Sequence, residues 1–138
     1  MKTEHQEESN TFTLLMYALL MILMFWGGTA FGQATLTDAN FTKVNNGTSV
    51  VEFWAPWNEQ NMCSEWLLDI TGATYYIMDV QSKQAKDLKI KVLPTLIVFN
   101  DGIEIKRFEG NIQFQLCPKR TPKKVQGVIN ELSNLNRY

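Results

Sequence analysis

The sequence predicts a mixed α/β domain, in which a central mixed sheet carries helices on both faces, preceded by a single N-terminal transmembrane helix. Two observations predict this fold class. In a chain of 138 residues, no charged residue occurs between Glu8 and Asp38, and the remainder alternates between helical and strand patterns. A strand–helix–strand unit followed by a hairpin and a closing helix is typical of a sheet that is covered on both sides.

The N-terminal part of the chain divides into a polar tail at 1–11 and an apolar segment at 12–32. About 20 apolar residues suffice to cross a bilayer, and a domain of this size has no room to bury a helix that is apolar all round. We therefore expect a signal anchor in a single-pass membrane protein, with the globular domain in the periplasm or an equivalent exported compartment. The alternative is a cleaved secretory signal ending at Gly32-Gln33-Ala34, which would release a secreted soluble binding protein.

The domain is expected to follow a short linker at 33–36 and to occupy residues 37–138. Thr37 or Asp38 is suited to cap a first short helix, which Asn46-Gly47 ends. The strand at 49–54 is apolar on both faces, as central strands are. A helix at 59–70 is indicated by one apolar stripe at helical spacing, made of Met62, Cys63, Trp66, Leu67 and Ile70.

The second half of the domain is expected to complete the sheet. The pattern predicts a strand at 74–80, a short helix at 82–88 and a strand at 95–99. Asn100-Asp101-Gly102 predicts a hairpin turn, and 103–108 is the returning strand. A last helix at 122–135 is indicated by apolar residues at helical spacing, namely Val125, Val128, Ile129, Leu132 and Leu135.

Three segments carry a resemblance to a known family. The segment from Val51 to Trp57, with Asn58 and Asn61 after it, resembles the V-E-F-W-A-P-W-C-x-x-C segment of the thioredoxin and protein disulfide isomerase family, with asparagine at both cysteine positions. Val92-Leu93-Pro94-Thr95 resembles the family's V-x-P-T loop, whose proline is cis, and Phe99-Asn100-Asp101-Gly102 with Gly110 resembles its hairpin. The resemblance covers roughly 37–135 and implies the thioredoxin fold.

The resemblance also implies what the chain has lost and what it has kept. An amide cannot form a thiolate or a mixed disulfide, so dithiol exchange at this site is excluded and we expect no catalytic residue. Glu52 matches the family's buried acid, here paired or neutral beneath the sheet. An insert at 111–121 is expected beside the family's polypeptide-binding groove. The positions that match this groove are Trp57, Asn58, Leu93, Pro94, Thr95 and Gly110.

The two cysteines, Cys63 and Cys117, leave three interpretations open. Cys63 is a small buried apolar residue, or it forms a structural disulfide with Cys117 in an exported domain, or it is a displaced reactive thiol. The third interpretation would make the protein an atypical thiol–disulfide oxidoreductase that uses both cysteines.

Composition excludes several classes of function. The net charge of −1 implies no attraction to nucleic acid, and the only histidine, His5, lies in the polar tail, so we expect no metal and no cofactor. The leading expectation is a membrane-anchored, redox-inactive accessory or scaffold subunit, or a polypeptide-binding factor. Its expected partners are the lipid bilayer and either membrane protein subunits or an extended polypeptide.

Overall fold

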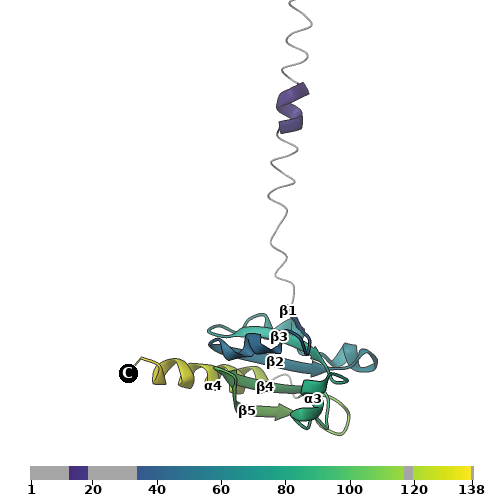
Figure 1. The fold of residues 1–138 in the computed structure, drawn as a ribbon, viewed down its shortest axis with the longest axis vertical. Helices are drawn as coiled ribbons and strands as arrows, with labels where there is room; N and C mark the ends of the chain where they lie inside the picture. Colours follow the sequence, from purple (N-terminus) through teal and green to yellow (C-terminus); the bar gives the residue numbers. More distant parts are fainter. Residues whose placement is uncertain (1–12, 19–33, 117–119, 138) are drawn as a thin grey trace, which may run out of the picture. The chain divides into compact units, whose positions relative to one another are not determined.

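The domain is built on one mixed sheet, as the sequence predicts (Figure 1). The computed structural model describes residues 13–18, 34–116 and 120–137. Within these ranges the sheet has five strands in the order β1-β3-β2-β4-β5. The strands are β1 (Ala34–Leu36), β2 (Thr48–Trp54), β3 (Thr74–Asp79), β4 (Thr95–Asn100) and β5 (Ile103–Glu109). The helical elements are η1 (Phe41–Asn45), η2 (Pro56–Asn61), α2 (Ser64–Leu67), α3 (Lys83–Asp87) and α4 (Thr121–Leu135).

The chain divides between Gly32 and Gln33 into two units, which are described separately. Most of the transmembrane helix predicted at 12–32, and all of the polar tail at 1–11, lie outside the described residues. Residues 13–18 are helical. Among the residues that the structure describes, no helix combines the length and the apolar character needed to cross a bilayer.

Strand β2 lies in the centre of the sheet. It pairs in parallel with β3 and antiparallel with β4, and every residue from Ser49 to Phe53 is buried. This confirms the central position in the sheet that was predicted from the apolar residues on both faces of this strand. Because both faces are covered, β2 requires apolar side chains at nearly every position, and the one buried carboxylate on it, Glu52, needs specific partners.

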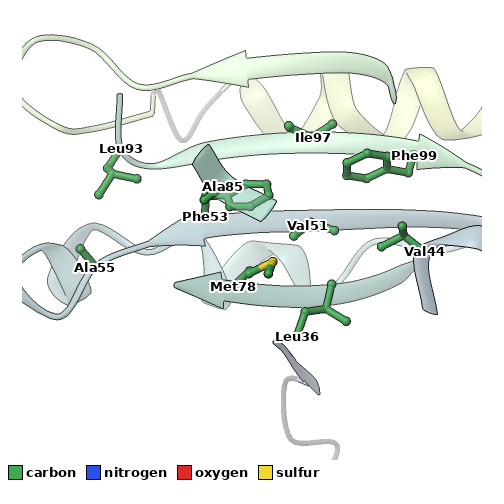
Figure 2. Packing of buried hydrophobic residues seen from close by; sticks show 10 residues of the cluster. All are labelled: Leu36, Val44, Val51, Phe53, Ala55, Met78, Ala85, Leu93, Ile97 and Phe99. Carbon is green, nitrogen blue, oxygen red and sulfur yellow. The ribbon is translucent and has the colours of Figure 1, made fainter. Parts of the chain in front are cut away.

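Two hydrophobic cores cover the two faces of the sheet. The first, here the α3-side core, contains Val51, Phe53 and Ile97 from the sheet with Ala85 from α3 (Figure 2). The second, here the α4-side core, packs sheet residues against α2 and α4. Helices on both faces are thus confirmed. The buried members of the α4-side core are Val50, Cys63, Leu67, Leu96, Val98, Val125, Ile129 and Leu132.

The start of the domain differs from the prediction. Residues 34–36, expected to be a linker, form the edge strand β1, whose register places Leu36 opposite Met78 of β3. The helix expected from Thr37 is a 3₁₀ helix that begins only at Phe41. The carboxylate of Asp38 instead accepts hydrogen bonds from the backbone N–H groups of Lys83 and Gln84, at 3.0 and 2.9 Å, so it caps α3.

The helix predicted at 59–70 is also wrong as a continuous element. The 3₁₀ helix η2 ends at Asn61, Met62 is extended (φ −61°, ψ 147°), and α2 covers only Ser64–Leu67. The physical reason is a competing acceptor. The N–H of Cys63 donates to Oε1 of Glu52 at 2.7 Å, and it therefore makes no helical bond to the preceding turn.

The hairpin between β4 and β5 forms at the predicted turn. Asp101 and Gly102 both have positive φ, 49° and 81°, which suits the Asp-Gly pair. The register shifts between Val98 and Phe99, so that Glu104 lies opposite Phe99 and Lys106 opposite Val98. Ile105 is the additional residue of a β-bulge.

Candidate functional site

Asn58, at the position where the resembled family has its first cysteine, is a buried amide. Asn58 lies on η2, directly after β2, and only 4% of it is exposed. Its Nδ2 donates to the carbonyl oxygen of Phe114 at 3.2 Å, and its Oδ1 accepts from Nδ2 of Asn61 at 2.6 Å. The two asparagines that replace the cysteines therefore form a hydrogen-bonded pair, and neither side chain can supply a thiolate.

The insert folds against this site, as the sequence predicts. Its Asn111 side chain accepts hydrogen bonds from the N–H groups of Gln113 and Gln115, which closes a compact turn. At the tip, Phe114 has a φ of 58°, an unfavourable value for an aromatic residue. Its ring contacts Trp57 edge-on, with 5.1 Å between ring centroids. The insert thus touches both Trp57 and Asn58.

The loop that resembles V-x-P-T has the expected geometry. The Leu93–Pro94 peptide bond is cis, and Oγ1 of Thr95 donates to the carbonyl oxygen of Val92 at 2.5 Å. Gly110 approaches this loop closely, because its N–H donates to the carbonyl oxygen of Pro94 and a Cβ on it would lie 2.7 Å from the carbonyl oxygen of Leu93. Only glycine fits such an approach.

The six residues predicted to form a polypeptide groove lie together but are unequally accessible. The side chain of Trp57 is 62% exposed, and Gly110 is partly exposed. The other four, Asn58, Leu93, Pro94 and Thr95, are buried. Polypeptide binding at these residues stays a prediction, and Trp57 is the one large side chain among them that is open to a partner.

Glu52 lies beneath the site in a buried network. Its Oε1 accepts from the N–H of Cys63 at 2.7 Å and its Oε2 from the hydroxyl of Tyr75 at 2.6 Å. Burial raises the pKa of Glu52, and these two hydrogen bonds offset part of the rise. The sequence left open whether this acid is paired or neutral, and the structure gives it two hydrogen-bond partners. Tyr75 was missed as its partner, because the contact joins two strands and no local pattern indicates it.

Cys63 is buried beside this carboxylate and forms no disulfide with any other described residue. Burial, together with the negative charge of Glu52, raises the pKa of the Cys63 thiol. A thiol that resists ionisation is a poor nucleophile, so the geometry favours the buried apolar interpretation over the reactive one. Cys117 lies outside the described residues, so the disulfide between Cys63 and Cys117 stays a prediction.

Comparisons with known proteins show what the whole domain is similar to. The chain is 32% identical to a thioredoxin of Staphylococcus saprophyticus over 84 residues, covering 54% of this chain and 81% of that protein. It is 33% identical to a thioredoxin of Staphylococcus aureus over 84 residues, which again cover 54% of this chain and 81% of that protein. The chain belongs to the thioredoxin family. No family model matches the chain.

A solved structure agrees with the fold of this thioredoxin-family chain. A thioredoxin of Malassezia sympodialis superimposes with a TM-score of 0.54 and 22% identity, covering 72% of this chain and 90% of that one. The likeness concerns the fold alone. Within this domain the candidate site consists of the Asn58–Asn61 pair and the insert, whose Phe114 carbonyl oxygen accepts a hydrogen bond from the Asn58 amide.

Proposed function

We propose that the protein is a redox-inactive, thioredoxin-like accessory subunit held at a membrane by its N-terminal segment. The observation that carries the proposal is the buried Asn58 amide at the nucleophile position, hydrogen-bonded to Phe114 and Asn61. Thiol–disulfide exchange needs an accessible thiolate there, and an amide engaged on both its oxygen and its nitrogen supplies none.

An accessory role requires a surface that a partner recognises, and the site offers one. Three large apolar side chains are exposed around it: Trp57 at 62%, Phe114 at 45% and Ile112 at 92%. Aromatic residues of this kind are typical anchors of protein interfaces. The turn that Asn111 closes and the hydrogen bond from Asn58 fix the insert that carries two of them. A polypeptide partner docking on Trp57 and Phe114 is the form of binding that these contacts favour.

The membrane part of the proposal rests on the sequence. The apolar segment 12–32 is long enough to span a bilayer, and β1 begins at Ala34, so the domain follows the segment almost directly. The domain is proposed to face the periplasm or an equivalent exported compartment, beside the membrane proteins that it assists.

The redox part is tested with purified full-length protein in mild detergent. Reduction of insulin disulfides by dithiothreitol is followed with and without the protein, with an active thioredoxin as the positive control. We expect no acceleration by the wild type and none by the variant that combines Cys63→Ser and Cys117→Ser. Acceleration by the wild type that the double variant loses would overturn the proposal in favour of an atypical oxidoreductase.

The accessory role is tested by affinity purification of the tagged protein from its native membranes. The expected result is a defined set of membrane proteins at fixed stoichiometry, which Trp57→Ala reduces. The intact mass of the purified chain is measured in the same preparation. A mature chain that begins near Ala34 and leaves the membranes at high salt would instead identify a secreted binding protein.

A further inference from the structure

β5 forms one edge of the sheet (Figure 1), and β4 is its only neighbouring strand among the described residues. It pairs with β4 alone, and within residues 34–116 and 120–137 no backbone hydrogen bond reaches its outer side. A free strand edge is a template for another extended chain, and β5 offers seven residues, with the bulge residue Ile105 interrupting their regular pairing. The opposite edge, β1, has only three residues and offers far less.

A groove of about 510 Å³ runs beside this edge, between β5 and α4. The register places Lys106 opposite Val98 and Phe108 opposite Leu96, two residues of the α4-side core, so Lys106 and Phe108 project on the α4 side of the sheet. The α4 wall is low at Gly127, where an added Cβ would meet no atom within 4 Å. The groove is lined by Lys106, Phe108, Lys124, Gly127, Val128 and Glu131.

The chemistry of the groove is basic at its rim and apolar at its floor. Lys106 and Lys124 are exposed, and in the described part of the chain neither takes part in an ion pair. Phe108 and Val128 are partly buried against the α4-side core. Glu131 is the one acidic residue among the lining residues. A partner whose acidic side chains lie near the two lysines, and whose apolar side chains contact Phe108 and Val128, therefore complements the groove.

We propose that the β5 edge binds an extended polypeptide segment that carries acidic and apolar side chains on one face. The segment adds to the sheet beside Ile103–Glu109 through backbone hydrogen bonds. Because alternate residues of a strand share a face, its groove-facing side chains reach Lys106, Lys124 and Phe108. The inference rests on the accessory role proposed above, to which it adds a second contact surface, distant in sequence from Asn58.

The test uses the full-length, ¹⁵N-labelled protein in detergent micelles and the peptide acetyl-Thr-Val-Thr-Glu-Thr-Glu-Thr-Val-Thr-amide. We expect backbone amide shifts concentrated in β5, and binding about tenfold tighter than that of the same peptide with lysine at both glutamate positions, the order expected when two exposed ion pairs replace two repulsions. A peptide N-methylated at alternate residues cannot pair with the edge and should not bind.

Two charge-reversal variants locate the site. Lys106→Glu combined with Lys124→Glu should reverse the preference between the glutamate and lysine peptides. The matched control, Lys86→Glu combined with Lys91→Glu, also removes two exposed lysines and should leave the preference unchanged. The inference is overturned if the two peptides bind equally, if the N-methylated peptide binds as well, if the shifts lie outside β5 and α4, or if β5 pairs with a second copy of the chain.

These measurements read binding, whereas the insulin assay reads thiol–disulfide exchange by the protein. A protein that lacks reductase activity but ignores the peptide refutes only the inference about β5. A protein that reduces insulin refutes the proposed function whatever the peptide does.

Discussion

The hydroxyl of Tyr75, on β3, donates a 2.6 Å hydrogen bond to Oε2 of Glu52, on the neighbouring strand β2. The register places Tyr75 opposite Val50, two residues before Glu52, so the hydrogen bond runs diagonally between the strands. The other carboxylate oxygen holds the N–H of Cys63. One buried acid thus ties two strands to the start of α2.

Replacing Glu52 with glutamine is expected to flatten the pH dependence of stability. Burial raises the pKa of Glu52 above its ordinary value of 4.5. The folded state therefore binds the extra proton, and the free energy of unfolding falls as pH rises from about 4.5 through the folded pKa, by at most about 1.4 kcal/mol per pH unit. Urea unfolding at a series of pH values, at constant ionic strength, should show this decline in the wild type and its loss in Glu52→Gln.

Glu52→Ala is the matched control for that experiment. It also removes the titrating group, but it leaves the Tyr75 hydroxyl and the Cys63 N–H without their acceptor, so we expect it to lower the free energy of unfolding by about 1–3 kcal/mol relative to Glu52→Gln. An unchanged pH slope in both variants would show that Glu52 is not the group responsible.

Cys63 should resist alkylation in the folded protein. It is 3% exposed, and burial beside Glu52 raises the pKa of its thiol, so both access and thiolate fraction are low. In the Cys117→Ser background, we expect iodoacetamide at pH 8 to label Cys63 at least about a hundredfold more slowly in buffer than in concentrated urea. Equal rates would contradict the buried position of this thiol.

Asn58→Asp should loosen the insert. The substitution replaces an N–H donor with a carboxylate oxygen that faces the carbonyl oxygen of Phe114, and it places a charge at a buried position. We expect a loss of about 1–3 kcal/mol in the free energy of unfolding and faster hydrogen exchange at 111–116. Asn130→Asp, on the exposed side of α4, is the control and should change neither quantity. Unaltered exchange in Asn58→Asp would show that this hydrogen bond does not hold the insert.

Two glycines should respond in opposite directions to alanine. At Gly110 the new Cβ would lie 2.7 Å from the carbonyl oxygen of Leu93, a backbone atom, so we expect a loss of at least about 1–3 kcal/mol. At Gly127, inside α4, the Cβ would meet open space, and the higher helix propensity of alanine should add about 0.5–1 kcal/mol. Urea unfolding of both variants checks the pair, and a stable Gly110→Ala would refute the close approach.

The sequence was sufficient to predict the elements whose structure depends on a local pattern of residues. The central strand β2, the Asp101-Gly102 turn and the apolar stripe of α4 each follow from neighbouring residues, and their bounds agree with the prediction to within one residue. The cis Leu93–Pro94 bond followed from the family resemblance.

The failures share a different cause, since each depends on a partner in another element of the fold. Asp38 caps α3, some 45 residues later, rather than its own helix. The helix predicted at 59–70 breaks because Glu52 takes the N–H of Cys63. The hydrogen bond from Tyr75 to Glu52, which was missed, spans 23 residues. A pattern of apolar spacing carries no information about such pairings.

The Asp38 cap has a mechanical consequence. A pull on the N-terminal end of the chain enters the domain at Ala34, on a strand of three residues that pairs only with β3. β1 therefore yields first under tension, and its detachment draws away the carboxylate that holds the N-terminus of α3. The β2–β4 pair lies further inside the sheet, so the load reaches it only after β1 has detached. The domain would extend by one strand and one loosened helix while its centre stays folded.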